Sequence, residues 1–136
     1  MGLHMLRDDA LKVSRDGFAL RVSLPWIRSL PLWAVSDVAL AVDGEPVPLV
    51  TMMIGERTIP ASALRFERGW WFVQDRLVLS GRRRLEPGRH DVALSLHLIV
   101  PYLQAGPDGP LTLPFREERA LMLGALDEMT VSRDVA

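Results

Sequence analysis

The chain has 136 residues and a formal net charge of −1 at pH 7, with 49% hydrophobic and 24% charged residues. These values are typical of one folded domain with a hydrophobic core, and they argue against nucleic acid or an anionic membrane as the main partner. The absence of cysteine excludes disulfides and thiolate metal sites.

The first residues predict a lead-in to the fold rather than a targeting segment. Residues 1–9 carry acidic side chains where a signal peptide would carry its apolar core, and we expect them to be flexible. No apolar run approaches the length of a membrane helix, so we expect a soluble, cytoplasmic protein. We expect a short strand over 10–13, a turn at Asp16 and Gly17, and a strand over 18–24, where apolar and polar residues alternate.

Residues 24–33, LPWIRSLPLW, predict an ordered but irregular segment across the end of a sandwich. Its two prolines each remove a backbone donor and push the preceding residue out of helical geometry. Its Trp26, Arg28 and Trp33 have the composition of an interface anchor, with prolines that lower the cost of ordering. A plug that fills the core of this chain is the alternative.

Alternation over 37–43 predicts another strand, and the Asp-Gly pair at 43–44 predicts a tight hairpin. The return strand would run over 45–53, but its two prolines restrict it to the edge of a sheet. A very short strand over 57–59 and one helical turn over 60–64 are expected to follow, with proline at the start of that turn.

Short strands are expected over 70–73 and 76–80, followed by a basic loop, GRRRLEPG, over 81–88. The three arginines of this loop, together with Arg89, have two interpretations. They are either a solvated loop tip or a docking patch for an acidic partner surface.

A long half-buried strand over 89–102 is the clearest element of the sequence, because apolar residues alternate with less apolar ones along it. A Pro-Gly pair suited to a type II turn precedes it, and Pro101 is expected to end it because proline cannot donate to a ladder. A strand of this length needs partner strands and a second layer over its apolar face.

The end of the chain is ambiguous. Residues 104–114, rich in proline and glycine, predict a loop. Over 116–129 propensity favours a helix, whereas the need to complete a sandwich favours a closing strand, which we prefer. We treat 125–136 as a tail. The chain as a whole, 1–136, therefore predicts a single all-β domain, an antiparallel, jelly-roll-like β-sandwich with irregular connections rich in proline and tryptophan.

No catalytic or metal-binding set is predicted from the sequence. It contains no phosphate-binding glycine loop, nucleophile elbow or HExxH motif. The histidines His4, His90 and His97 lack the spacing of a ligand set and are interpreted as surface or interface residues.

Five short motifs, taken in order, carry a resemblance. They are WIRSLPL at 26–32, VDG at 42–44, WF at 71–72, GRHDV at 88–92 and PY at 101–102. Their order and spacing resemble the small (β) subunit of the bacterial C-glycoside deglycosidases. The resemblance covers most of 17–123.

Two residues within the first motif depart from the family pattern. Ile27 and Ser29 stand where the family tends to have an aromatic residue and glycine.

The resemblance implies a non-catalytic β-sandwich subunit, bound in a hetero-oligomer to a larger α subunit similar to the TIM-barrel sugar-phosphate isomerases. No cofactor is implied for this chain. The partner would hold a divalent metal, typically manganese, and the general base. The complex would cleave the carbon–carbon bond between sugar and aglycone in 3-oxo C-glycosides by elimination.

Two other functions remain open: a stand-alone carbohydrate-binding β-sandwich with tryptophans as stacking platforms, and a self-assembling structural domain. The residues that we predict to contact a partner are Trp26, Arg28, Trp33, Trp70, Trp71, His90, His97 and Tyr102.

Overall fold

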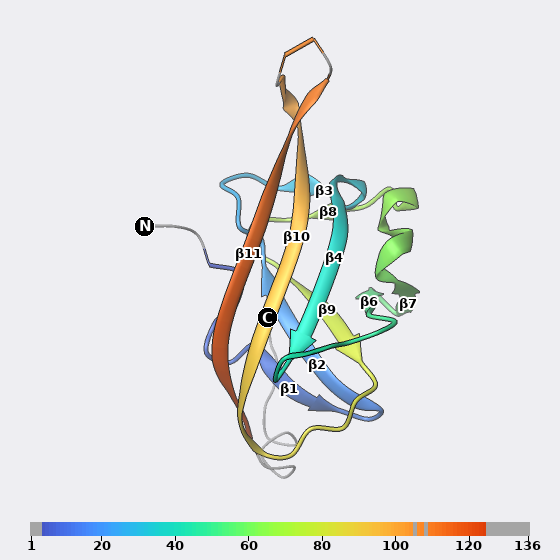
Figure 1. Cartoon of the computed structure of the whole chain (residues 1–136). Helices are drawn as coiled ribbons and strands as arrows, with labels where there is room; N and C mark the ends of the chain where they lie inside the picture. Colours follow the sequence, from blue (N-terminus) through green and yellow to red (C-terminus); the bar gives the residue numbers. More distant parts are fainter. Residues whose placement is uncertain (1–3, 105, 108, 125–136) are drawn as a thin grey trace.

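The computed structural model describes residues 4–104, 106–107 and 109–124, and in it two antiparallel sheets face each other (Figure 1). The first sheet has five strands. In their order across the sheet they are β1 (Leu11–Ser14), β2 (Gly17–Ser23), β9 (Arg76–Gly81), β6 (Thr51–Ile54) and β7 (Arg57–Pro60).

The second sheet has four strands, and a two-stranded ribbon lies at one end of the molecule. The second sheet consists of β11 (Pro110–Leu123), β10 (Gly88–Gln104), β4 (Val35–Val42) and β5 (Glu45–Pro46). The ribbon pairs β3 (Leu30–Pro31) with β8 (Trp70–Trp71). Two 3₁₀ helices, η1 (Leu32–Ala34) and η2 (Ala61–Phe66), complete the described elements.

The core lies between the two sheets and explains the alternation along their strands. β2 contributes Phe18, Leu20 and Val22, and the facing strand β10 contributes alternate residues from Val92 to Leu98. Period-2 burial of this kind is what a strand with one face on a core requires. The all-β prediction is confirmed, while the jelly-roll connectivity stays a prediction.

The β10–β11 hairpin is longer than predicted. β4 pairs with β10 only as far as Leu98, whereas the β10–β11 ladder continues to Val100 and is resumed at Gln104. Figure 1 shows the two strands projecting beyond both sheets. The prediction that the strand ends at Pro101 is therefore wrong. A register shift between Val100 and Gln104 accommodates the proline, as bulges do.

The predicted loop over 104–114 is wrong from Pro110 onward, where β11 begins. β11 lies at the edge of its sheet, and proline is tolerated there because its missing donor need not face a neighbouring strand. The closing strand that we preferred over a helix is confirmed as far as Leu123. The remainder of 116–129, and the tail over 125–136, lie outside the described residues.

The predicted return strand over 45–53 is also corrected. Only Glu45 and Pro46 pair with β4, and the chain then crosses to the other sheet as β6. The two prolines explain the short pairing, since each lacks a ladder donor. The short strand at Arg57–Pro60 and the helical turn after Pro60 are confirmed.

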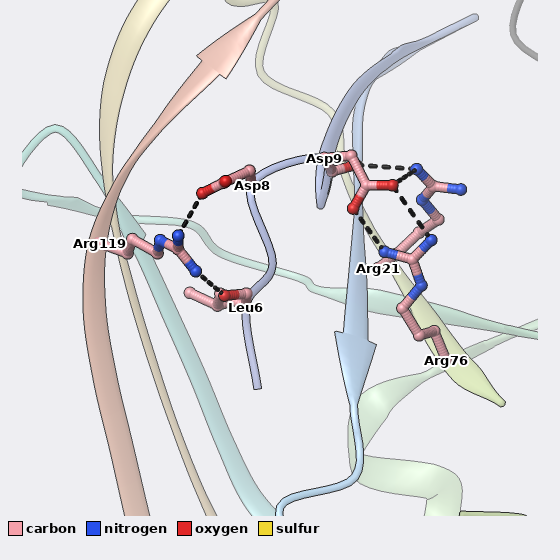
Figure 2. A network of polar contacts seen from close by, with 6 residues as sticks. All are labelled: Leu6, Asp8, Asp9, Arg21, Arg76 and Arg119. Atoms are coloured by element: carbon pink, nitrogen blue, oxygen red, sulfur yellow. Dashed lines mark hydrogen bonds and ion pairs between the residues drawn. The ribbon is translucent and has the colours of Figure 1, made fainter. Parts of the chain in front are cut away.

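The start of the chain is part of the fold rather than an outlying lead-in. Met5 and Leu6 are buried in the core, which corrects the expectation of a flexible segment over 1–9 for these residues. The Glu117 carboxylate of β11 accepts hydrogen bonds from both of their amides, and Arg119 donates to the Leu6 carbonyl and contacts Asp8 (Figure 2). Glu117 and Arg119 of β11 therefore hold this N-terminal segment in place by hydrogen bonds.

Asp9 anchors the same segment to the other sheet. Its carboxylate accepts hydrogen bonds from Arg76 of β9 at 2.9 Å and from Arg21 of β2 at 3.3 Å (Figure 2). The hydrogen bond from Arg76 lowers the pKa of Asp9, and although burial opposes the change, the charges of both arginines reinforce it. Residues 5–9 thus bridge the two sheets.

Candidate functional site

Several exposed apolar residues belong to the β3–β8 ribbon, the segments next to it and the projecting hairpin. Figure 1 shows the ribbon towards the end of the molecule from which the hairpin projects. We call this surface the aromatic end. It consists of Trp26, Ile27, Arg28, Trp33, Trp70, Phe72, Val73, Tyr102 and Leu103. Surface patches of this kind often mark interaction sites, because soluble monomers rarely leave large apolar side chains together in water.

Two irregular segments build most of this surface. Leu30 and Pro31 pair with Trp71 and Trp70, and the amide of Val73 donates to the Ser29 hydroxyl at 2.8 Å. Residues 26–33 and 69–73 therefore run side by side. This pairing places Ser29 beside Val73, although the two segments are about forty residues apart in the sequence.

Tyr102 connects the hairpin tip to the same surface. Trp26 Nε1 donates to the Tyr102 hydroxyl at 2.6 Å. The Arg28 guanidinium carbon lies 5.8 Å from the centroid of the Tyr102 ring, within the range of a cation–π contact. Two side chains of the irregular segment thus hold the tip of the hairpin in place.

The two adjacent tryptophans of β8 have opposite environments. Trp70 is 52% exposed, whereas Trp71 is 1% exposed and donates from Nε1 to the Asp75 carbonyl at 3.1 Å. Consecutive residues of a strand point to opposite sides, which explains the difference. Trp71 is a core residue that a partner cannot reach, so its prediction as an interface residue is wrong.

Three other predicted residues lie on the aromatic end. Arg28 is exposed, Trp33 is partly exposed, and Trp26 is half-buried and packs against the core. Trp26 packs within the chain, as the plug alternative expects, and its indole N–H donates to Tyr102. Its role as an interface anchor stays a prediction. Neither the sequence motifs nor their spacing identified Phe72, Val73 or Leu103 as part of this surface.

No family model matches the chain, but curated relatives do. The β subunit of a C-glycoside deglycosidase from Arthrobacter globiformis is 37% identical over 97 residues, which cover 67% of this chain and 74% of the relative. The β subunit of a 3′-dehydrocarminate deglycosidase from a Microbacterium species is 32% identical over 99 residues, covering 70% and 75% of the two chains.

The chain belongs to the family of C-glycoside deglycosidase β subunits. A further C-glycoside deglycosidase β subunit, from Microbacterium trichothecenolyticum, is 29% identical over 115 residues, covering 73% of this chain and 79% of the relative. The resemblance carried by the five sequence motifs is therefore confirmed. As β subunits, these relatives each form part of a deglycosidase with at least one other subunit.

In this member of the family, His90 lies far from the aromatic end. Tyr102 lies twelve positions further along β10, which at about 3.3 Å per residue corresponds to roughly 40 Å. His90 Nδ1 lies 2.7 Å from Asp43 Oδ2, and Nε2 lies 2.6 Å from the Glu86 carbonyl oxygen. Both ring nitrogens face acceptors, so the doubly protonated ring satisfies both contacts.

The pKa values of His90 and Asp43 follow from this geometry. Burial lowers the pKa of His90, but the hydrogen bonds to Glu86 and Asp43 and the nearby carboxylates outweigh burial and raise it overall. The hydrogen bond from His90 lowers the pKa of Asp43, and a hydrogen bond from the Asp91 amide adds to the effect. Sequence reasoning used Asp43 only as a turn residue and missed this partnership.

His97 lies on the outer face of β10 and pairs with Ser36 of β4. Its Nδ1 is 2.8 Å from Asp37 Oδ2. Asp37 has φ of 52° and occupies a bulge in β4, where the register with β10 shifts between Ser95 and His97. Aspartate is one of the few non-glycine residues that adopt this conformation readily. The bulge places the carboxylate beside the ring.

The basic loop has a structural role that neither sequence interpretation anticipated. Arg83 donates to the carbonyl of Val42 at 3.0 Å and to those of Glu45 and Pro46 at 3.4 and 3.2 Å. These bonds satisfy backbone acceptors where the short β4–β5 pairing ends. Arg82 and Arg84 are exposed.

The described part of the chain brings together no three histidine, aspartate or glutamate side chains that could hold a metal ion. Its two-residue contacts, His90 with Asp43 and His97 with Asp37, fall short of the ligand sets that divalent metals need. No helix in the described residues is long and apolar enough to cross a membrane.

Proposed function

We propose that this chain is the accessory β subunit of a heteromeric C-glycoside deglycosidase whose chemistry takes place on a larger α subunit. The observation that carries the proposal is the similarity to curated β subunits, which the chain matches over about three quarters of their length. The exposed aromatic end adds support, because an apolar surface of this kind is expected where another subunit is missing.

The reaction that we propose for the complex is the cleavage of the carbon–carbon bond between sugar and aglycone in 3-oxo C-glycosides. The 3-keto group acidifies the hydrogen at C2, and a general base removes it. The electron pair of the broken C–H bond forms a double bond between C2 and C1. The bond from C1 to the aglycone breaks, and the aglycone carbon takes up a proton. The complex would thus be a carbon–carbon lyase.

The partner that we propose is a TIM-barrel-like α subunit, which supplies the general base and a divalent metal, typically manganese, that polarises the keto oxygen. The described residues of the present chain do not fit such a metal. Their part is to bind the α subunit and shape its site. We place the complex in the cytoplasm.

Co-expression with the α subunit of the source organism tests the proposal. We expect a stable complex that releases free aglycone from a 3-oxo C-glycoside, and an isolated β subunit with no activity. Activity of the isolated chain, or failure of the two subunits to associate, would contradict the proposal. Manganese content should follow the α subunit through purification.

A stand-alone carbohydrate-binding module is the second candidate. A hollow of about 560 Å³ beside Trp26 favours it, since Asp8 and Arg119 also line this hollow and could hydrogen-bond to sugar hydroxyls beside the indole. Calorimetry of the purified chain with C-glycosides separates the two candidates. Binding without the α subunit that is lost in Trp26→Ala would favour the module.

A further inference from the structure

We propose that the aromatic end is the face that the α subunit covers, and that the facing surface of the α subunit is apolar with carboxylates opposite Arg28. This inference rests on the proposed function, and it adds which face of the β subunit makes the contact.

The distribution of exposed apolar side chains is the first argument. Ile27 is 71% exposed, and Trp70, Phe72, Val73 and Tyr102 are each about half exposed. Side chains of this size, clustered and aromatic, are the usual anchors of protein interfaces. The other large exposed apolar residues in the described part of the chain lie elsewhere along it, and they are Leu49, Met53, Phe66 and Met122.

The second argument is that the surface is already rigid. The Ser29 hydroxyl holds the Val73 amide, Trp26 holds Tyr102, and the two prolines of the irregular segment are buried. A surface ordered by its own chain pays little conformational entropy when a partner binds. Aromatic residues that merely filled a mobile loop would lack these contacts.

The charge of Arg28 is the third argument. Its guanidinium lies over the Tyr102 ring, and no carboxylate of the described residues lies within 4.0 Å of it. By contrast, Arg21 and Arg76 are paired with Asp9. A cation stacked on an aromatic ring at the rim of an apolar surface fits an acidic group on the partner.

The outer face of the second sheet is a poorer docking surface. The hollow on this face, about 650 Å³, has small side chains on its floor, among them Ala41, Ala93 and Ala120. Arg116 and Glu118 at its rim are paired with each other. This face carries the exposed Met122 and Arg89 but no cluster of exposed aromatic side chains.

Single charge substitutions test the inference. Ile27→Glu places a carboxylate in the centre of the proposed contact, and Met122→Glu is its matched control, because Met122 is similarly exposed at 63% but lies beside Arg89 near the far end of the hairpin. We expect Ile27→Glu to weaken binding to the purified α subunit by at least about tenfold, and Met122→Glu by less than about twofold. Unchanged thermal melting of both isolated variants excludes misfolding as the cause.

Arg28 variants test the carboxylates of the partner. We expect Arg28→Glu to weaken binding more than Arg28→Ala, with a difference that shrinks at high salt because screening weakens both attraction and repulsion. Equal effects of the two variants would contradict the proposal that carboxylates of the α subunit face Arg28.

The outcomes separate the two proposals. If the wild-type subunits associate and Ile27→Glu binds as well as wild type, the docking surface is wrong while the proposed function stands. If the wild-type chain does not bind the α subunit, both are wrong. If Ile27→Glu instead breaks a homodimer of the isolated chain and leaves α-subunit binding intact, the aromatic end is a self-association surface and the inference is overturned.

Discussion

The two ends of the long β10–β11 hairpin differ in how their side chains are satisfied. At the His90 end, His90 is paired with Asp43 and the Glu86 carbonyl, and Arg83 donates to nearby backbone carbonyls of the same chain. At the aromatic end, Tyr102 and its neighbours are ordered by hydrogen bonds but leave their apolar surfaces in water. At one end polar side chains find partners within the chain, and at the other apolar side chains stay exposed.

Truncation of the two adjacent tryptophans should show the largest effect. Trp71→Ala removes a core side chain and is expected to lower the free energy of unfolding by about 3–5 kcal/mol. Trp70→Ala, which acts on an exposed ring, should change it by less than about 1 kcal/mol. Denaturant unfolding of the two variants measures the difference. Equal losses would mean that both rings support the fold and would weaken the contrast between core and contact surface.

Removal of the Arg83 side chain tests whether this arginine stabilises the His90 end of the hairpin. Arg83→Ala leaves backbone carbonyls of the β4–β5 turn without their charged donor, so we expect a loss of about 1.5–2 kcal/mol in unfolding free energy. Its exposed neighbour Arg82 provides the control, since Arg82→Ala should cost less than about 0.5 kcal/mol. Binding to the α subunit should be unaffected by either change.

The His90–Asp43 contact predicts a pH dependence. Because the folded-state pKa of His90 is raised above 6.5, its contribution to stability is complete below pH 6.5 and is lost as the pH rises through the folded pKa. The stability difference between wild type and His90→Gln should therefore be larger at pH 6 than at pH 9, by about 1 kcal/mol. Chemical denaturation at both values measures it.

Asp43 provides the control for this pH dependence. Its lowered pKa means that its own contribution is complete above pH 3.8 and is lost only as the pH falls through the folded pKa, outside the range tested. Asp43→Asn keeps a residue that tolerates the φ of 54° at this turn but removes the charge opposite His90. A pH dependence as large in Asp43→Asn as in wild type would show that other groups cause it.

The smallest effect is expected at the hairpin tip. Tyr102→Phe removes the acceptor of the Trp26 indole N–H, but water can replace it at this exposed position, so the stability loss should be about 0.5 kcal/mol. A change in tryptophan fluorescence should accompany it. A loss of several kcal/mol in unfolding free energy would mean that the hairpin tip stabilises the fold. The two ends of the hairpin would then not differ as described.

Particular elements show how far the sequence could be interpreted. Alternation predicted β2, β4 and most of β10, because burial of one face imposes a period of two on any strand. It could not predict the continuation past Pro101 or the strand that starts at Pro110. The position of a strand at a sheet edge decides whether proline is tolerated, and pairing partners far away in the sequence decide that position.

The sequence by itself determined the all-β class, the family and the proline-rich segment around Trp26. These depend on local pattern and on motifs in a given order. Only the tertiary structure decided that Trp71 is buried and Trp70 exposed, and that His90 meets Asp43 across 47 positions. It also decided that residues 26–28, 72–73 and 102–103 form one surface. Side-chain environment follows from strand pairing and long-range contacts, and no local pattern encodes which distant segment lies alongside.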